Sequence, residues 1–277
     1  MADEWRRYLA QQIELGGAEI VLSGAAGQQG RAPASPFTEL SLAQEPTVPL
    51  ARRSADQESS PAAPLPRWSR GAPPIPGPGL TIESPGHALG DELVGLKTLD
   101  EVAERIRTTH CCGLCSNRIN AVPGDGNPEA RLVLVGEGPG ANEDAQGKPF
   151  VGQAGNLLNG ILEAIEVPRE SVYITNIVKC RPPQNRKPLP DEIAACIPYL
   201  HRQLEIIQPK VILALGSTAA EAMLGVRKSL GELRNKVHTY NGIPLVVTYH
   251  PAALLRNPNW KKPTWDDVRI VRQLLDR

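Results

Sequence analysis

The sequence predicts a three-layer α/β/α domain with a central, mainly parallel four-stranded sheet, preceded by a disordered N-terminal extension. Short apolar runs alternate with longer amphipathic segments from residue 93 onward, which is the order expected of βαβ units. The apolar runs lack polar alternation, as strands do when helices cover both faces of a parallel sheet. The first third of the chain, in contrast, has little periodic apolar content.

The elements of the domain can be placed in order along the chain. Thr98 and Glu101 have the spacing of a capping box, so a helix is expected to begin there and to run to about Thr108. The predicted strands are 131–135, 172–178, 211–215 and 245–248, and the predicted helices are 154–165, 191–207, 217–224 and 265–275. Ligands of such sheets bind at the carboxyl ends of the strands, so four strand ends are candidate sites.

The extension before the domain has two parts. A short amphipathic helix fits residues 1–15, because three large apolar residues there share one face. Residues 16–92 are rich in Pro, Ala, Ser and Gly, and too few apolar residues are present to offset the entropy of ordering, which predicts a disordered linker. The domain is then expected over 93–277. The N-terminal helix could bind an unidentified protein or pack on the domain.

Composition and charge narrow the class of protein. The 277 residues are 41% hydrophobic, and no apolar run reaches the ~18 residues of a membrane helix. The first residues lack the basic and apolar regions of a signal peptide, so we expect a cytoplasmic monomer without a membrane partner. The net charge is zero, but residues 97–277 carry 23 Lys and Arg against 19 Asp and Glu, which permits binding to DNA.

Five cysteines indicate a metal site. Cys112 and Cys115 form a C-x2-C pair, and Cys180 and Cys196 follow, separated by 15 residues. Disulfides are not expected in a cytosolic protein, whereas four thiolates bind zinc or an iron–sulfur cluster. The spacing leaves both metals open, and a plain buried role for Cys196 is the alternative. Cys111 is a spare thiol beside the pair.

The first strand end is followed by a glycine-rich segment, residues 136–152, with the sequence GEGPGANEDAQGKPFVG. A glycine-rich turn after a strand often binds a phosphate. The glycines do not have the spacing of a dinucleotide-binding fingerprint, however, and no G-K-[ST] motif is present. The segment also contains the acids Glu137, Glu143 and Asp144 and ends near Phe150, which is unusual for a phosphate site.

The other three strand ends carry polar side chains, each with two interpretations. Asn176 could pair with the edge of a base or cap a turn. Ser217 and Thr218 could hold a DNA phosphate, or Ser217 could simply cap the following helix. His250 could stabilise a developing anion by donating a hydrogen bond, although a lone histidine is more often structural.

The segment after His250 contains two further candidates for contact with DNA. Leu254 and Leu255 are followed by Arg256, and apolar residues on a loop can wedge into a base stack. The same residues could instead form the first turn of a helix that covers the sheet. The sequence leaves these two interpretations open.

Taken together, these segments resemble one family, the iron–sulfur, family 4 (type A) uracil-DNA glycosylases. The resemblance covers residues 96–275 and includes the motifs GEGPGANEDAQGKPFVGQAGNLL, VYITNIVKCRPPQNRKP and HPAALLR. It implies a monofunctional enzyme that flips deoxyuridine out of single- or double-stranded DNA and hydrolyses the N-glycosidic bond, leaving an abasic site for base excision repair. A catalytically silent uracil- or DNA-binding module of the same fold is the alternative.

The resemblance also implies a structural 4Fe–4S cluster held by Cys112, Cys115, Cys180 and Cys196. The segment that follows Cys115 is shorter than is usual in the family, so Cys111 is a candidate to replace Cys112 as the first ligand. An unrelated zinc-ribbon protein is a further alternative, and the colour of the purified protein distinguishes the two metals.

The binding residues of a uracil pocket are implied in the same way. Phe150 would stack on the flipped base, and Asn176 would read the O4 and N3–H edge, which cytosine presents in reverse. Glu143 would fill the space near C5 and exclude the methyl group of thymine. Backbone groups at Glu137 and Gly138 would contact uracil and the attacking water.

His250 and Glu137 are the expected catalytic residues. By resemblance, His250 would donate a hydrogen bond to uracil O2 as the glycosidic bond breaks and so stabilise the uracil anion. Family 1 enzymes position the water with an aspartate, but Gly138 stands at that place, so Glu137 is the nearest side chain, with a backbone carbonyl as the alternative. No lysine nucleophile is indicated, and lyase activity is therefore not expected.

Overall fold

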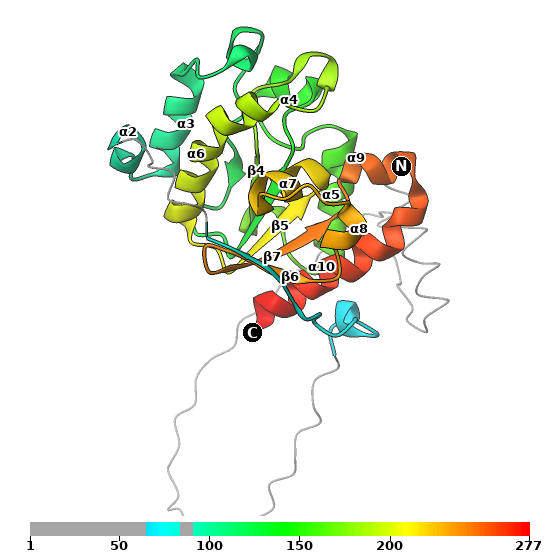
Figure 1. Ribbon diagram of the computed structural model, residues 1–277. Coiled ribbons are helices and arrows are strands. Elements are labelled where there is room, and N and C mark those ends of the chain that lie inside the picture. Colours follow the sequence, from blue (N-terminus) through cyan, green and yellow to red (C-terminus); the bar gives the residue numbers. More distant parts are fainter. Residues whose placement is uncertain (1–64, 84–90) are drawn as a thin grey trace, which may run out of the picture.

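The computed structural model of the protein describes residues 65–83 and 91–277 (Figure 1). Its sheet has the strand order β1-β6-β7-β5-β3-β4-β2. The strands are β1 (Pro78–Ile82), β2 (Asp125–Gly126), β3 (Leu132–Gly136), β4 (Tyr173–Asn176), β5 (Val211–Leu215), β6 (Val237–Tyr240) and β7 (Ile243–Thr248). Helices pack on both faces of this sheet, so the predicted three-layer α/β/α class is confirmed.

The helices of the described residues are α2 (Asp91–Gly95), α3 (Leu99–Thr108), α4 (Ala141–Gln146), α5 (Gln153–Ala164), α6 (Pro190–Ile207), α7 (Ser217–Leu224), α8 (Leu230–Leu233), α9 (Pro251–Arg256) and α10 (Lys261–Asp276). All five predicted helices are present among them, and four short helices, α2, α4, α8 and α9, were not predicted as such. Single 3-10 turns are η1 (Arg67–Ser69), η2 (Gly113–Ser116), η3 (Arg169–Ser171), η4 (Pro183–Asn185) and η5 (Pro258–Trp260). The capping box before α3 is present, because Thr98 and Glu101 exchange side-chain-to-backbone hydrogen bonds.

The prediction of a four-stranded sheet is wrong, because three further strands extend the sheet at its two edges. The four predicted strands form the parallel centre, where β7, β5, β3 and β4 are neighbours. At one edge β2 pairs antiparallel with β4, and at the other β6 pairs antiparallel with β7 and parallel with β1. None of the three added strands has an apolar run, since β2 has two residues and β6 reads VHTY. They are held by backbone pairing to an existing edge.

The centre of the sheet separates two hydrophobic cores. Val133 and Val135 of β3 belong to the core that α6 and α7 cover, whereas Leu132 and Leu134 belong to the core beneath α5 and α10. Side chains of a strand alternate between the two faces, so a strand that is buried on both faces is apolar throughout. Because the central strands are parallel, their carboxyl ends all lie on the same side of the domain, across the top of the sheet and not at its outer strands.

Residues 65–83 pack against the domain, so the prediction of a disordered linker over 16–92 is wrong for this stretch. Trp68 is only 5% exposed, and the guanidinium of Arg272 lies over its ring. Further along, β1 pairs with β6 at the edge of the sheet. Arg269 and Gln273 also donate to the carbonyl oxygens of Arg70 and Pro73. These contacts with distant segments oppose the ordering entropy, and none produces the periodic pattern from which order is predicted.

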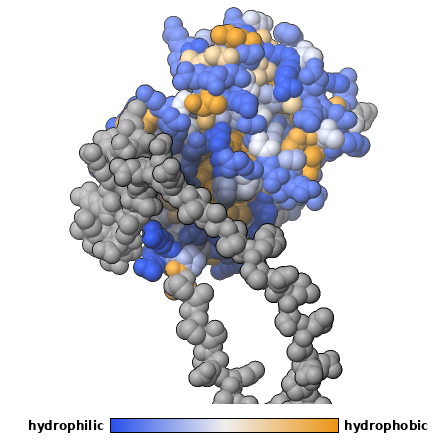
Figure 2. All heavy atoms as spheres, turned by 180° about the vertical axis from the view of Figure 1, so that it is seen from behind, coloured by the Kyte–Doolittle hydropathy of each residue, from blue (hydrophilic) through white to orange (hydrophobic). Residues whose placement is uncertain are grey.

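The predicted helix over 1–15 lies outside the described residues, as do the linker residues 16–64 and 84–90. Within the described part of the chain, no helix is both long and apolar enough to cross a membrane. On the face shown in Figure 2, hydrophilic side chains predominate and hydrophobic ones lie in small separate groups. This is the surface expected of a domain whose apolar residues are gathered in its core.

Candidate functional site

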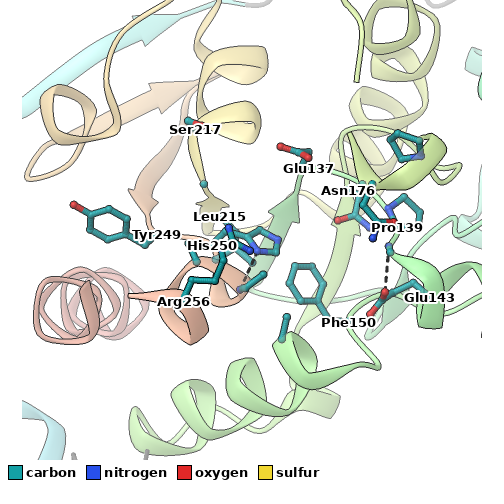
Figure 3. A pocket seen from close by; sticks show the side chains of 18 of the residues that line it. Glu137, Pro139, Glu143, Phe150, Asn176, Leu215, Ser217, Tyr249, His250 and Arg256 are labelled. Carbon is teal, nitrogen blue, oxygen red and sulfur yellow. Dashed lines mark hydrogen bonds between the residues drawn. The ribbon is translucent and has the colours of Figure 1, made fainter. Parts of the chain in front are cut away.

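The carboxyl ends of β3, β4, β5 and β7 open into one cavity of about 690 Å³. Each strand end contributes a wall residue: Glu137 follows β3, Asn176 ends β4, Gly216 follows β5, and His250 follows β7. Figure 3 shows Phe150 between His250 on one side and Asn176 on the other. The structure therefore brings together residues from all four strand ends that the sequence singled out.

Asn176 presents an unpaired polar atom in this cavity. The residue is 2% exposed, and its Oδ1 has no hydrogen-bond partner within the described residues. An unsatisfied buried acceptor costs about 1–3 kcal/mol, so such an atom at a cavity wall indicates a ligand with a matching donor. Gly136 makes room for it, because a Cβ there would lie 2.4 Å from Asn176 Oδ1 and 2.9 Å from the Phe150 ring.

Phe150 is held in an uncommon conformation. Its φ is 51°, in the left-handed region, although it is not a glycine, and its side chain is 6% exposed. Gly155 in α5 allows this, because a Cβ at that residue would lie 1.8 Å from the carbonyl oxygen of Phe150. The Phe150 ring lies 5.4 Å from the ring of His250, with the two planes tilted by 30°. One flat apolar surface thus faces the cavity next to the histidine.

Glu143 has a role that the sequence reasoning missed. Its Oε2 accepts a hydrogen bond from Gly140 N at 3.1 Å, and its Oε1 accepts from Val151 N at 3.0 Å and Gly152 N at 3.1 Å. The carboxylate therefore joins the start of α4 to the segment before α5 and fixes both ends of the glycine-rich loop. Three charge-assisted hydrogen bonds also fix the side chain itself where it lines the cavity.

Glu137 is held by a residue from a different strand end. The hydroxyl of Thr218, the second residue of α7, donates to Glu137 Oε2 at 2.5 Å. Thr218 is only 3% exposed, so its side chain binds Glu137 and is not accessible to a DNA phosphate, which was one of the two interpretations that the sequence left open. Ser217 is exposed and lines the cavity, but it does not cap α7, whose N-cap is Gly216.

His250 is a neutral hydrogen-bond donor with a defined tautomer. It caps α9, and its Nδ1 accepts a hydrogen bond from Ala252 N at 3.2 Å, which leaves the proton on Nε2. Burial lowers the pKa of His250 to about 4; Arg256 adds to this effect, and Glu143 opposes it. The ring is therefore uncharged at neutral pH, and its Nε2–H is free to donate to a ligand.

The predicted wedge residues are placed differently from the expectation. Leu254 is fully buried in the core beneath α9, so it does not reach a base stack. Leu255 is partly buried against the same core. These residues belong to α9, so the alternative interpretation is correct in placing them in a helix, although this helix packs mainly on α5. Arg256 remains exposed at the cavity wall.

Sequence reasoning also missed several residues of the cavity wall. Pro182, Asn185 and Arg186 come from the loop after β4, Tyr249 directly precedes His250, and Trp260, ten residues after it, stacks on Tyr249. The first three directly follow a strand end that had been singled out, so their place could have been expected. Nothing in the local pattern around Trp260 indicates that it returns to the cavity.

All five cysteine thiols converge at a second site beside η2. The sulfur atoms of Cys111, Cys112 and Cys196 lie within 4.8 Å of one another. Cys115 Sγ lies 3.9 Å from Cys111 Sγ and 3.8 Å from Cys180 Sγ. The four predicted ligands are thus brought together from η2 and its N-cap, the segment after β4, and α6, and the spare thiol of Cys111 joins them.

The guanidinium of Arg118 makes direct contact with one of the thiols. Arg118 Nη1 donates to Cys180 Sγ at 3.2 Å, and the same guanidinium binds the carbonyl oxygens of Ile106 and Thr109. A guanidinium beside a sulfur stabilises the thiolate that a metal requires. The donor set, thiols with an adjacent cation, therefore fits a thiolate-bound metal centre.

Comparison with known proteins agrees with this geometry. The family model of the uracil DNA glycosylase superfamily matches residues 123–273. Similar curated proteins are type-4 uracil-DNA glycosylases. That of Saccharolobus solfataricus is 47% identical over 65% of this chain and 88% of that protein. The enzyme of Thermotoga maritima is 48% identical over 57% of this chain and 84% of that protein. The enzyme of Archaeoglobus fulgidus is 40% identical over 65% of this chain and 94% of that protein. The chain belongs to the uracil DNA glycosylase superfamily and, within it, to the type-4 family.

Proposed function

We propose that this protein is a uracil-DNA glycosylase that flips deoxyuridine out of DNA and hydrolyses its N-glycosidic bond, leaving an abasic site for base excision repair. The observation that carries the proposal is that two unused groups line the same cavity. One is Oδ1 of Asn176, which has no hydrogen-bond partner in the described part of the chain, and the other is the neutral donor His250 beside the Phe150 ring. The cavity has room for a base together with part of its sugar and phosphates. The type-4 relatives, named for this activity, support it.

Recognition of uracil would rest on Asn176 and Phe150. The unpaired Oδ1 of Asn176 would accept from uracil N3–H, and its Nδ2 would donate to O4, while Phe150 stacks on the ring. Cytosine has an acceptor at N3 and a donor at C4, so both groups of Asn176 would stay unpaired, which is costly in a buried site.

Discrimination against thymine would rest on Glu143. The backbone amides that hold its carboxylate prevent the side chain from moving aside when a C5 methyl group enters. Backbone groups at Glu137 and Gly138 would contact uracil and the attacking water. A Cβ on Gly138 would lie 2.7 Å from the side chain of Val178, so a glycine is needed here for the backbone to pack against the segment after β4.

The chemical step would depend mainly on stabilising the leaving group. His250 Nε2–H would donate to uracil O2 while the bond from C1′ to N1 breaks and its electron pair stays on the base. Water then adds its oxygen to C1′ and loses a proton, with Glu137 held in place by Thr218 as the side-chain acceptor. None of the described residues that line the cavity is a lysine, so the enzyme would be monofunctional.

The cysteine cluster would hold a structural 4Fe–4S cluster on Cys112, Cys115, Cys180 and Cys196, with Cys111 as a substitute for Cys112. Such a cluster would supply a cross-link between η2 and α6, and no redox step is needed for hydrolysis. Zinc has the same preference for thiolates. A brown protein with absorbance near about 400 nm identifies the iron–sulfur cluster, whereas a colourless protein with bound zinc contradicts it.

The remaining parts of the proposal concern partners and location. Ser217 and Arg256, both exposed at the cavity wall, are the proposed contacts with DNA phosphates, in single- or double-stranded substrates. Action as a monomer remains a prediction. Five free thiols support a reducing, cytoplasmic location. A protein partner for the N-terminal segment remains a prediction.

The proposal is tested by incubating the purified protein, without added metal, with oligonucleotides that contain one uracil opposite guanine or in a single strand. Alkaline cleavage of the product at the abasic site is the expected result. A matched oligonucleotide with thymine at the same position serves as the control and should stay intact. Intact uracil DNA that is nevertheless bound would instead identify a silent binding module and contradict the enzymatic proposal.

A further inference from the structure

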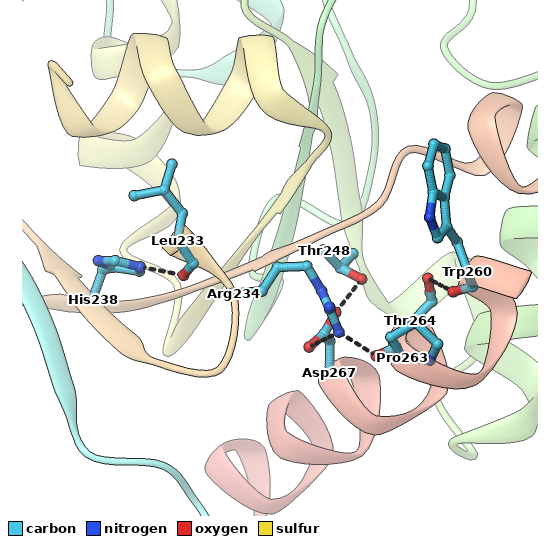
Figure 4. Close-up of polar contacts among 8 residues, drawn as sticks. All are labelled: Leu233, Arg234, His238, Thr248, Trp260, Pro263, Thr264 and Asp267. Atoms are coloured by element: carbon cyan, nitrogen blue, oxygen red, sulfur yellow. Dashed lines mark hydrogen bonds and ion pairs between the residues drawn. The ribbon is translucent and has the colours of Figure 1, made fainter. Parts of the chain in front are cut away.

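A buried ion pair lies next to Thr248, the last residue of β7, two positions before His250 (Figure 4). Arg234, which follows α8, donates to Asp267 in α10 through both Nε, at 2.7 Å from Oδ2, and Nη2, at 3.0 Å from Oδ1. Arg234 is 8% exposed and Asp267 is 0% exposed. Burying two charges costs several kcal/mol before their attraction is counted, so a pair of this kind is weak evidence of a role in stability alone.

The same carboxylate holds the last residue of β7. Thr248 Oγ1 donates to Asp267 Oδ2 at 2.6 Å, and Thr248 is 1% exposed. The carbonyl oxygen of Thr248 also accepts from Gly216 N at 2.8 Å, next to the end of β5. Both the side chain and the backbone of the residue two positions before His250 are therefore fixed.

The guanidinium of Arg234 also holds the next residue, Tyr249. Its Cζ lies 4.8 Å from the centroid of the Tyr249 ring, and Trp260 stacks on that ring at 4.8 Å with an angle of 6° between the planes. Because Trp260 covers one face of the ring, the cation must lie over the other. Arg234 Nη2 donates in addition to Pro263 O at 2.8 Å, which fixes the guanidinium against α10.

These contacts all lie next to His250, although neither Arg234 nor Asp267 contacts it directly. Tyr249 and His250 are among the described residues that line the cavity, whereas Arg234 and Asp267 are not. The histidine donor must be aimed within tenths of an ångström of the leaving oxygen, and small misplacements are costly in rate. A rigid anchor on both preceding residues would provide this aim.

We propose that Arg234, Asp267 and Thr248 are positioning residues for His250, which fix the end of β7 so that Nε2 of the imidazole points at the leaving base. This inference rests on the proposed function and adds to it a buried device outside the cavity. The charged pair fixes orientation because the guanidinium fork and the carboxylate can meet in only one geometry.

The test uses Thr248→Val, which removes the hydroxyl and keeps the shape, with Thr248→Ser as the conservative rescue. Under single-turnover conditions, Thr248→Val should lower the rate about tenfold or more, with the KM for uracil DNA unchanged, because misplacement acts on the chemical step. Thr248→Ser should restore most of the rate. Arg234→Lys, which keeps the charge and loses the fork, should resemble Thr248→Val. Asp276→Asn, which breaks an ion pair elsewhere on α10, should match wild type.

Combining Thr248→Val with His250→Ala distinguishes a positioning role from a general loss of fold stability. If Thr248 acts through His250, adding Thr248→Val to His250→Ala should cause no further loss of rate. An equal loss in both backgrounds, or a wild-type rate in Thr248→Val, would overturn the inference. Thermal unfolding of each variant shows that assays are run on folded protein. A wild-type enzyme that releases no uracil would contradict the proposed function instead, so the two failures are distinguishable.

Discussion

The two walls of the cavity are held in place by different kinds of contact. The wall built from residues 136–152 is fixed by the three backbone amides that Glu143 binds and by close packing at Gly136. The opposite wall, which carries His250, is fixed by the buried Arg234–Asp267 pair. The partners of Glu143 in the first wall lie within nine residues of it, although Glu137 in the same wall is held by Thr218, 81 residues away along the chain. The hydrogen-bond partners in the second wall are 19 and 33 residues apart.

This difference matches the tasks proposed for the two walls. A wall that selects a base must resist the entry of a methyl group, and a short loop tied by its own backbone is stiff. A wall that carries a catalytic donor must place one atom accurately, and a buried, directional ion pair does so. Substitutions in the first wall should therefore change selectivity, whereas substitutions in the second should change rate.

The largest expected effect is in the second wall. His250→Ala should lower the rate of uracil release about 10²–10³-fold, as the loss of one anion-stabilising donor does in other enzymes. The measurement is single-turnover release from an oligonucleotide with one uracil. His110→Ala, which removes an exposed histidine, is the matched control. A wild-type rate for His250→Ala would remove this residue from the mechanism.

The next effect concerns Asn176, which lies against Gly136 in the first wall. Asn176→Asp should lower kcat/KM for uracil about 10- to 100-fold, because a carboxylate has no N–H to donate to O4. Preference for uracil over cytosine should fall as well, which is measured with paired oligonucleotides that differ in the one base. Normal turnover of uracil with cytosine still fully rejected would show that Asn176 does not read the base edge.

A smaller effect is expected for Glu143→Gln. The amide keeps the size of the side chain but loses one acceptor, so one end of the loop is no longer held. Thymine opposite guanine should then be released at a rate about tenfold above the wild-type background, on the scale of one lost hydrogen bond to a charged group. The exposed Glu163→Gln is the control. Unchanged rejection of thymine would argue that another group excludes the methyl.

The last prediction concerns stability and not the rate of uracil release, and it follows from the burial of His250. Burial holds the pKa of His250 at about 4 in the folded protein, below its ordinary value of 6.5. As the pH falls below 6.5 the unfolded chain takes up a proton that the folded protein refuses, so the free energy of unfolding decreases until about pH 4. In His250→Ala this part of the decrease should be missing, as measured by urea unfolding at several pH values. Equal slopes in the two proteins would contradict the proposed neutral state.

Much of the domain could be predicted from local pattern. The four central strands and the helices α5, α6 and α7 follow from apolar runs and periodicity, because burial on both faces leaves a clear signature. The strands β1, β2 and β6 could not be predicted in this way, because an edge strand pairs through its backbone and needs no particular side chains. Order in residues 65–83 was missed for the same reason, as Trp68 alone marks it.

The sequence by itself determined which residue types stand at the strand ends, because the ends of buried parallel strands can be located from their apolar runs. It also determined which cysteines are available as ligands. The tertiary structure alone decided what each of these residues touches. In the fold, Thr218 donates to Glu137 and is buried away from any phosphate, and Leu254 lies in the core. Burial keeps His250 neutral, so that it can donate a hydrogen bond. Hydrogen-bond partners and burial arise from contacts between distant segments, and no local pattern records them.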